Sequence, residues 1–367
     1  MAEPLRVLQL YPKEDYFTGA AIQLWELANA LARRGHDVVI ATRPADHWAQ
    51  RCRRTGLVQY GVPMRSELDL PSAWRLAQII RAHRIDVVHA HKGKARTLAM
   101  IAAAAVRLPV LILNRGVSFP LGRFQRLGYT SRRVNAIVAV CESIRQVLVR
   151  SGVDAKKIEV IYSATDTARF HPGIDGSAVR LELGFQPGDF VITQIGVRSW
   201  KGNDDVLLAM IAVSAAAPQA RLLIVGARYP ESTYASVRRR RLTGRVCVIG
   251  YREDIPQILA ASDCCVDASY AGLGLTGPIR EALAVGTPVV ATDLEGSPEL
   301  LTHRVTGLLV PPRRPDVLAR ALLDVAADRQ QACAMAMEGR RRVEARFSLA
   351  VKVERTEALY RRLLDAT

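Results

Sequence analysis

A glycine-rich loop joins a strand pattern to a helix pattern in residues 269–284, which read SYAGLGLTGPIREALA. Pro278 stands where the helix would begin, a position at which its missing N–H group costs nothing. The free backbone amides of residues 275–277 and the positive end of the helix dipole would then form a cradle for a phosphate group. Glu281, one turn into the helix, could accept hydrogen bonds from vicinal hydroxyls such as those of a ribose. An ordinary glycine-rich connection is the alternative interpretation.

Apolar runs on both sides of this loop alternate with amphipathic segments, and the alternation appears twice along the chain. Such a rhythm predicts parallel strands joined by helices, which is the α/β class of fold. The first helix is predicted over residues 21–34, where Gly35 supplies a stop signal. The predicted strands are residues 6–11, 36–42, 87–91, 109–113, 136–140 and 158–161 in the first series and 191–196, 220–226, 246–250, 264–269, 288–292 and 306–310 in the second, followed by helices over residues 316–326, 329–346 and 349–364.

Two doubly wound parallel-sheet domains are therefore predicted, with residues 171–188, which are rich in turn residues, as the linker. We expect a first domain of residues 1–172, a second of residues 173–348, and a last helix, residues 349–367, that packs back on the first domain. In open α/β sheets, ligands bind beyond the carboxyl ends of the strands. The two domains should therefore face a cleft, and the chemistry should lie in loops that follow strands.

Two more loops follow predicted strands and carry residues suited to phosphate chemistry. Residues 196–202 read GVRSWKG, in which Arg198 and Lys201 would clamp a diphosphate leaving group, because negative charge builds on such a group in the transition state. A solvated pair in an arginine-rich protein is the alternative. Gly19 and Ala20 open the first helix, where small residues let the backbone approach a ligand and helix amides offer a second anion site.

Composition narrows the class of protein. The chain has 367 residues, of which 49% are hydrophobic and 23% charged, as in a globular protein of two domains. The uncharged apolar stretch at residues 97–106 is far shorter than the about 20 residues that cross a bilayer. No signal-peptide pattern precedes Lys13, so we expect a cytoplasmic protein. The six cysteines form no CxxC pair, which argues against a zinc site.

The net charge of +16 is concentrated in the first half of the chain. Residues 1–163 contain 25 Lys and Arg against 12 Asp and Glu, whereas residues 164–367 contain 26 against 23. The asymmetry predicts that the first half faces nucleic acid, a membrane surface or an acidic substrate, with a solvated arginine-rich surface as the alternative. Nucleic acid is disfavoured because the chain has no basic stripe interleaved with aromatic residues.

The three loops occur in the order and spacing of a known family: the sequence resembles the retaining glycosyltransferases of family 4, which have the GT-B fold. The resemblance covers nearly the whole chain and is specific, well beyond a single glycine-rich loop. The matching segments are residues 19, 27–36, 89–91, 139–143, 157–162, 166–170, 196–202, 225–226, 281–293 and 307–310.

The resemblance implies transfer of a sugar from a nucleotide diphosphate sugar to a glycan or lipid-linked acceptor, with retention at the anomeric carbon and with no metal ion or other cofactor. The first domain would lie on the acceptor side, and the second would bind the donor. No protein nucleophile is evident, so the implied mechanism is front-face displacement assisted by the departing phosphate. The implied donor contacts are Arg198, Lys201 and the amides at Gly274, Leu275, Thr276 and Gly277 on the diphosphate, Glu281 on the ribose, Gly196 at the strand end, Tyr251 and Arg252 at the base, and Gly19 and Ala20 from the other domain.

The sequence departs from the family pattern at two places. The family usually has a glutamate eight residues before the one that matches Glu281, and here Leu273 stands there, or Ala271 if an insertion is allowed. The family also commonly has a histidine near the reacting sugar, where this chain has Asn114 and Arg115. Neither is a good general base, and an arginine cannot be deprotonated.

The end of the third predicted strand offers another candidate, His91, although a lone histidine at a strand end is more often structural. Lys92 follows it directly. We predict that Lys92, Arg96 and Arg115 bind an anionic substituent of the acceptor or of the donor sugar.

Two functions of the same fold remain open. The resemblance and the basic first half favour a transferase of envelope polysaccharide or lipopolysaccharide assembly, bound peripherally to an anionic membrane at the cytoplasmic face of the inner membrane. The two departures leave as the alternative a nucleotide-sugar-binding protein without transferase activity, or an epimerase of the same architecture.

Overall fold

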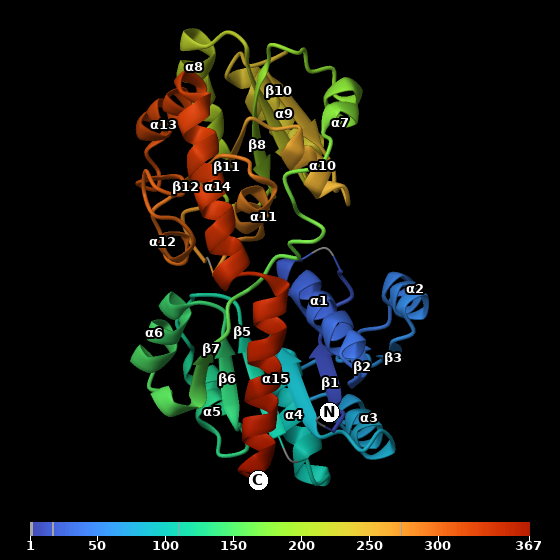
Figure 1. Ribbon diagram of the computed structural model, residues 1–367. Coiled ribbons are helices and arrows are strands. Elements are labelled where there is room, and N and C mark those ends of the chain that lie inside the picture. Colours follow the sequence, from blue (N-terminus) through green and yellow to red (C-terminus); the bar gives the residue numbers. More distant parts are fainter. Residues whose placement is uncertain (1–2, 17, 109, 273) are drawn as a thin grey trace. The chain divides into compact units, whose positions relative to one another are not determined.

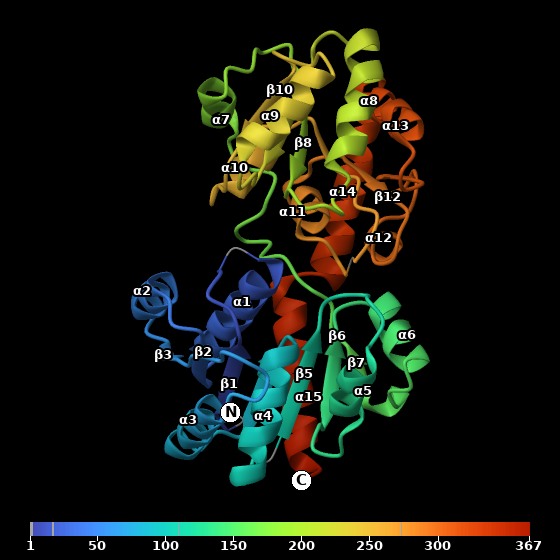
Figure 2. The same cartoon turned by 180° about the vertical axis from the view of Figure 1, so that it is seen from behind.

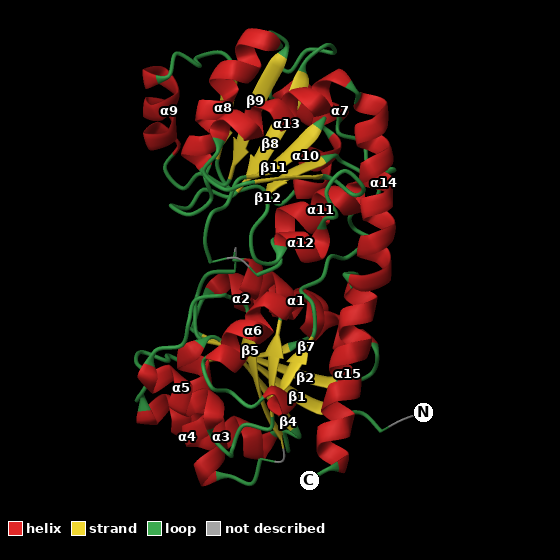
Figure 3. Cartoon of the chain, turned by 90° about the vertical axis from the view of Figure 1, so that its left-hand side faces the viewer, coloured by secondary structure: helices red, strands yellow, loops and turns green. Residues whose placement is uncertain are grey.

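The structure is a computed structural model that describes residues 3–16, 18–108, 110–272 and 274–367. The chain forms two compact units (Figure 1). The first comprises Met1–Ala164 and Leu349–Thr367, and the second Thr165–Ser348. In each unit a layer of parallel strands lies between helices (Figure 3), so the predicted pair of doubly wound parallel sheets is confirmed.

The first unit is built on a seven-stranded parallel sheet in the order β3-β2-β1-β4-β5-β6-β7. Its strands are β1 (Arg6–Tyr11), β2 (Asp37–Thr42), β3 (Val58–Gly61), β4 (Val87–His91), β5 (Val110–Arg115), β6 (Ala136–Ala139) and β7 (Ile158–Val160). Its helices are α1 (Gly19–Arg33), α2 (Asp46–Thr55), α3 (Leu70–Ala82), α4 (Gly93–Ala105), α5 (Arg123–Thr130), α6 (Glu142–Arg150), the 3-10 helix η1 (Ala155–Lys157) and α15 (Leu349–Asp365).

The last helix, α15, completes the core of the first unit and lies beside α1 (Figures 1 and 2). Its apolar residues join buried side chains of α1, α2 and the strands, and Trp48 of α2 is the largest of these. Each large apolar side chain buried in this way contributes about 1.5–3 kcal/mol. The Tyr360 hydroxyl adds polar contacts, at 2.7 Å from His89 Nδ1 on β4 and 3.3 Å from Gln9 Nε2 on β1.

The second unit contains a six-stranded parallel sheet in the order β10-β9-β8-β11-β12-β13. Its strands are β8 (Phe190–Ile195), β9 (Ala220–Val225), β10 (Val246–Ile249), β11 (Cys264–Asp267), β12 (Val289–Thr292) and β13 (Leu308–Val310). Its helices are α7 (Ser177–Glu182), α8 (Asn203–Ala216), α9 (Pro230–Arg239), α10 (Ile255–Ala260), α11 (Gly277–Val285), α12 (Ser297–Leu300), α13 (Pro315–Ala327) and α14 (Arg329–Arg346).

The predicted linker over residues 171–188 was wrong. Residues in this stretch form α7, and Val179 of α7 is buried in a cluster with β8 and β9 of the second unit. Residues 165–172 also belong to the second unit, where the Thr165 N–H donates to the Phe347 carbonyl (2.9 Å). The chain therefore passes between the units twice, after Ala164 and after Ser348.

In both sheets the strand order reverses beside the strand that comes first in sequence, between β1 and β4 and between β8 and β11. The carboxyl end of an open sheet at such a reversal is the usual place for a ligand. The part of the chain that the structure describes has no helix that is long and apolar enough to cross a membrane.

Candidate functional site

The loops after β8 and β11 lie next to each other, because these strands are neighbours in the parallel sheet. The Tyr270 N–H donates to the Trp200 carbonyl (2.9 Å), and the Tyr270 hydroxyl donates to the Ser199 carbonyl. Helices α8 and α11 begin directly after the two loops. A ligand at this edge of the sheet would meet backbone amides and the positive ends of two helices.

Loop 196–202 is held in shape by two amide side chains. Gln194, buried on β8, donates from Nε2 to the Lys201 carbonyl (2.7 Å). Asn203 Nδ2 donates to Gln194 Oε1 (3.0 Å) and to the carbonyl of Gly196 (3.3 Å), the residue that ends the strand. The loop therefore presents Lys201 and the exposed Arg198 from a fixed backbone.

Gly202 is the position at which this loop tolerates no side chain. Its φ is +65°, and an added Cβ atom would overlap the carbonyl oxygen of Ala268. We expect Gly202→Ala to lower the free energy of unfolding by about 3 kcal/mol, because the overlap adds to the strain of left-handed backbone.

The matched control for this prediction is Gly244, which has a φ of +76° and open space around the Cβ position. Gly244→Ala should cost only about 1 kcal/mol, from backbone strain alone. Urea unfolding of both variants measures the two losses. Equal losses would show that the overlap at Gly202 does not matter.

Lys201 forms a buried ion pair with Asp267 at the end of β11. Its Nζ lies 2.8 Å from Oδ2 of a carboxylate that is 3% exposed. Ser269 donates to the other oxygen, Oδ1, from its N–H (3.1 Å) and its hydroxyl. Burial by itself raises the pKa of Asp267, but the charge of Lys201 and these hydrogen bonds outweigh burial and lower it. Since an ammonium group has three N–H donors, this pair fixes Lys201 at the loops while leaving donors for a ligand.

The start of α11 also carries groups suited to an anion. Thr276 is the N-cap, and its buried Oγ1 has no hydrogen-bond partner among the described residues. Arg280, also buried, donates from Nη1 to the Leu275 carbonyl (2.6 Å). Because the C=O and N–H of a trans peptide point in opposite directions, this bond turns the Thr276 N–H away from Arg280. Of the other predicted cradle residues, Gly274 is half-buried in the loop and Gly277 is the first residue of α11.

Glu281 lies one turn into α11, and its carboxylate approaches the start of the helix. A Cβ atom on Gly277 would be 3.0 Å from Glu281 Oε1. Burial raises the pKa of Glu281, while the charges of Arg280, Arg169 and Lys201 act in the opposite direction. The carboxylate makes no hydrogen bond within the described part of the chain, so it can accept hydrogen bonds from a ligand's hydroxyls. Leu273, the residue at the usual position of a second glutamate, lies outside the described residues, and Ala271 is half-buried in the loop.

The predicted base-pocket residues follow β10. Tyr251 is half exposed. Arg252 is held by two carboxylates, since its Nε and Nη2 lie 2.8 and 2.6 Å from Asp254 and its Nη2 lies 2.9 Å from Glu182 of α7. The hydrogen bonds to Asp254 and Glu182 raise the pKa of Arg252. The guanidinium therefore already has hydrogen-bond partners within the protein, and its contact with a nucleobase stays a prediction.

In the first unit, Gly19 and Ala20 begin α1, after Thr18 caps it by accepting a hydrogen bond from the Ala21 N–H (3.4 Å). No described atom lies within 4 Å of the Cβ position of Gly19, so the start of α1 is open there. Its contact with a donor phosphate stays a prediction.

His91 is buried at the end of β4, with its Nε2 2.8 Å from Gln9 Oε1 and its ring stacked on that of His89 (4.5 Å between centroids). Burial holds the pKa of His91 well below its ordinary value, and the charges of neighbouring groups add to this effect. These contacts favour a structural role for His91, and a catalytic role stays a prediction. Arg115 ends β5, beside β4.

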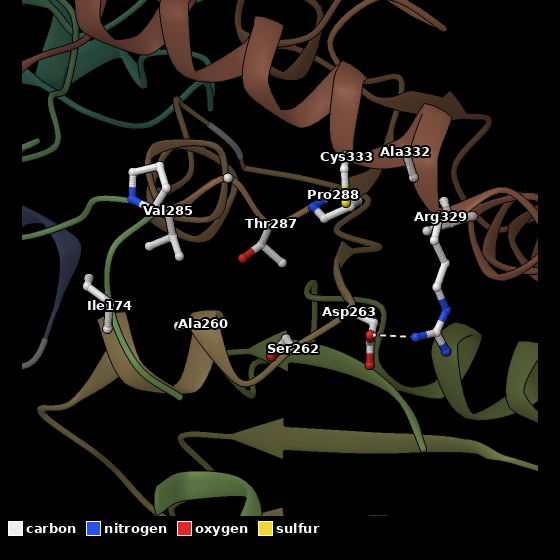
Figure 4. Close-up of a pocket in the computed structure, with 13 residues that line it drawn as sticks. Ile174, Ala260, Ser262, Asp263, Val285, Thr287, Pro288, Arg329, Ala332 and Cys333 are labelled. Atoms are coloured by element: carbon white, nitrogen blue, oxygen red, sulfur yellow. Dashed lines mark hydrogen bonds and ion pairs between the residues drawn. The ribbon is translucent and has the colours of Figure 1, made fainter. Parts of the chain in front are cut away.

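A cavity of about 200 Å³ lies elsewhere in the second unit (Figure 4). Asp263 and Pro288 line it and precede β11 and β12, so it lies at the amino edge of the sheet, opposite the loops described above. Arg329 of α14 spans part of it to reach Asp263 (3.2 Å). None of the predicted site residues lines this cavity.

Three polar residues of the site were missed by the sequence analysis: Gln194, Asp267 and Arg280. Each lies within or at the end of a mostly apolar element, and these elements read FVITQI, CCVD and GPIREALAV respectively. A polar side chain among buried neighbours must be hydrogen-bonded or paired, and that is the signal that could have identified them.

Known proteins share this architecture. The family model "Glycosyltransferase Family 4" matches residues 17–169, and "Glycosyl transferases group 1" matches residues 189–328. A GDP-mannose-dependent monoacylated alpha-(1-6)-phosphatidylinositol monomannoside mannosyltransferase of Corynebacterium glutamicum is 32% identical over 304 residues, which cover 77% of this chain and 78% of the relative. A UDP-Gal:alpha-D-GlcNAc-diphosphoundecaprenol alpha-1,3-galactosyltransferase of Escherichia coli is 25% identical over 332 residues, 84% and 81% of the two chains. Among solved structures, Anabaena HepE in complex with UDP has the same fold, with a TM-score of 0.86 at 22% identity over 97% of this chain and 99% of that one.

Proposed function

The chain belongs to the family 4 glycosyltransferases of the GT-B fold, and we propose that it transfers a sugar, with retention at the anomeric carbon, from a nucleotide diphosphate sugar to a glycan or lipid-linked acceptor. The acceptor would belong to envelope polysaccharide or lipopolysaccharide assembly. The observation that carries this proposal is the Lys201 ammonium, fixed by Asp267 beside the N-terminus of α11.

The second unit binds the donor in this proposal and stabilises the leaving group. Lys201 and Arg198 neutralise the diphosphate as its bond to the sugar breaks, and the Thr276 hydroxyl and the amides of the loop bind its oxygens. A single donor aimed at developing negative charge is worth about 10²- to 10³-fold in rate. Glu281 accepts hydrogen bonds from the ribose hydroxyls.

Retention follows from the direction of attack. The acceptor oxygen forms its bond to the anomeric carbon on the face from which the diphosphate leaves, and a phosphate oxygen takes the acceptor's proton. The products are the new glycoside and a nucleoside diphosphate. The proposal uses no covalent enzyme intermediate, no metal ion and no other cofactor.

The relatives support the donor and acceptor classes without selecting one member of either. The Corynebacterium relative is named for GDP-mannose, the Escherichia coli relative for UDP-Gal, and the HepE structure contains UDP. The printed acceptors of the first two relatives are a phosphatidylinositol mannoside and a diphosphoundecaprenol-linked sugar. A lipid-linked acceptor is therefore part of the proposal.

The proposal also includes contact between the first unit and an anionic membrane, at the cytoplasmic face of the inner membrane. Val117, Phe119 and Leu127, on and just before α5, are exposed apolar residues. Arg123 and Arg126 are exposed on the same helix. Apolar side chains among arginines suit the surface of an anionic bilayer.

A thermal-unfolding screen with UDP, GDP, ADP, dTDP and CMP, without metal and with EDTA present, tests the donor site. A ligand that binds only the native state raises its stability by mass action, so we expect one nucleotide to raise Tm by a few degrees. Its sugar derivatives are then assayed for transfer, and proton NMR of the product reads the anomeric configuration.

The outcomes of this screen separate the alternatives. Nucleotide binding with no transfer to any lipid-linked or glycan acceptor would favour a nucleotide-sugar-binding protein, and interconversion of the donor sugar without acceptor would favour an epimerase. An inverted product would contradict the proposed mechanism. A rate abolished by EDTA would contradict the metal-free reaction.

A further inference from the structure

Most of the net positive charge of the first unit lies in one continuous stretch. Residues 87–141 contain nine Lys and Arg and no Asp or Glu. This stretch runs from β4 to the residue before α6, so it includes the carboxyl ends of β4 and β5 and the whole of α4 and α5. A surface with cations and no local counter-charge attracts anions.

Two arginines of this stretch lie on one aromatic ring. The guanidinium carbons of Arg96 on α4 and Arg115 at the end of β5 are 5.1 and 5.9 Å from the ring centroid of the buried Tyr129. Arg96 is 5% exposed, and its hydrogen bonds, to the Gln125 carbonyl and the Thr97 hydroxyl, are long at 3.4 Å. The Nε atoms of Arg96 and Arg115 are buried without a partner among the described residues.

Lys92 is the N-cap of α4, the helix that carries Arg96, and it lies at the reversal point of the first sheet. Its carbonyl accepts from the Arg96 N–H (3.1 Å), and its ammonium lies 5.8 Å from the ring centroid of Tyr11 at the end of β1. Burial lowers the pKa of Lys92, and the charge of Lys13 lowers it further, while Asp15 opposes the shift.

The nearest carboxylates do not neutralise this cluster. Asp15 is 3.8 Å from Lys13, and Glu67 lies against α4, 3.5 Å from the Thr97 hydroxyl. None of the carboxylates that the structure describes forms an ion pair with Lys92, Arg96 or Arg115. A buried charge without a counter-charge is costly, so the cluster gains stability when an anion is bound.

We propose that Lys92, Arg96 and Arg115 form a binding site for a phosphoryl group of the acceptor. In this proposal the half-buried Lys92 and Arg115 contact the oxygens, and the buried Arg96 contributes its positive charge. Guanidinium groups match phosphoryl oxygens in geometry, and N–H donors bound to a charged oxygen form the strongest hydrogen bonds. The identification of the anion with the acceptor rests on the proposed function, whereas the binding site itself does not.

The test measures binding of inorganic phosphate without turnover. The second unit offers its own phosphate cradle, so all measurements use the Lys201→Ala background. Thermal unfolding is compared in sodium phosphate and in sodium chloride at equal ionic strength and pH. We expect phosphate to stabilise this protein more than chloride does, and Arg115→Gln to weaken the phosphate affinity about tenfold, the loss expected for one charge-assisted hydrogen bond.

Lys92→Gly is a second variant in which stability and binding should change in opposite directions. Lys92 has φ +73° and ψ 164°, a conformation that only glycine adopts freely. The glycine should therefore raise Tm in chloride while weakening the response to phosphate. Arg107→Gln, an exposed arginine of the same stretch, is the matched control and should leave the response unchanged.

If phosphate stabilises Arg115→Gln, Lys92→Gly and Arg107→Gln to the same extent relative to chloride, the proposed binding site is wrong. This readout is independent of activity, so failure of sugar transfer and failure of the site are separate results. Vesicles of phosphatidylcholine with and without phosphatidylglycerol identify the source of the phosphoryl group. If Arg115→Gln loses binding to phosphatidylglycerol vesicles and Arg107→Gln does not, the phosphoryl group belongs to a lipid. If the protein binds free phosphate but not the vesicles, the phosphoryl group belongs to a soluble acceptor.

Discussion

Replacing Lys201 by methionine should lower turnover about 10²- to 10³-fold, because the departing diphosphate loses the cation that is fixed beside it. The same change should lower the free energy of unfolding by about 3 kcal/mol, since Asp267 is left as an unpaired carboxylate that is 3% exposed. Methionine keeps most of the volume of the lysine side chain, so packing changes little.

The double variant Lys201→Met/Asp267→Asn separates these two losses. With both charges removed, no unpaired buried ion remains, and stability should return to within about 1 kcal/mol of the original protein. Turnover should stay low, because the cation is still missing. Steady-state kinetics and urea unfolding of the three proteins provide the measurements. Near-normal turnover in Lys201→Met would show that the diphosphate is held elsewhere.

The stability of the first unit should fall as the pH decreases from 7.5 to 5. Burial lowers the pKa of His89 to about 3, and the charge of Lys352 acts in the same direction. In the unfolded chain a histidine has a pKa of about 6.5, so between these values the unfolded chain binds the proton more tightly. The contribution of His89 is complete above pH 6.5 and is lost progressively towards pH 3, with about 2 kcal/mol lost at pH 5.

The hydrogen bonds around His89 are compatible with its neutral form. Gln9 Oε1 accepts from His91 Nε2 (2.8 Å), and Gln9 Nε2 donates to the Tyr360 hydroxyl (3.3 Å). The hydroxyl proton is then free to point at His89 Nδ1, 2.7 Å away. A proton on Nδ1 would remove the acceptor for the hydroxyl proton inside the core.

Urea unfolding at pH 7.5, 6 and 5, followed by tryptophan fluorescence, checks this prediction, since three of the four tryptophans lie in the first unit. His89→Asn, which keeps an acceptor near Nδ1, should reduce the loss at low pH. His303→Asn, at an exposed position in the second unit, should not. A stability that does not change between pH 7.5 and 5 would contradict the neutral buried histidine.

Most strands could be predicted from the sequence, because long apolar runs between turn residues read the same way in isolation and in the fold. Strand β3 could not, since its four residues, VQYG, contain one aliphatic residue and lie at the edge of the sheet. The turn-rich residues around α7 predict a linker, because Val179 becomes part of an apolar core only through contact with β8 and β9.

Some residues of the candidate site could likewise be predicted from the sequence, and others could not. Local motifs predict Lys201, Glu281 and the amides before α11 as site residues, because loop composition carries that information. The partner of Lys201 is 66 residues away in sequence, and only the adjacency of β8 and β11 brings Asp267 to it. Likewise, the fold pairs Arg252 with Glu182 of α7, which the local sequence does not indicate.

The packing of α15 also sets the order in which the chain can fold during synthesis. The second unit is one uninterrupted segment, so all of it leaves the ribosome before α15 does. The first unit, although translated first, lacks Leu349, Val353 and Tyr360 of its core until then. We therefore expect the usual N-terminal-first order of domain folding to be reversed here, with the first unit exposed to chaperones and proteases for the longer time.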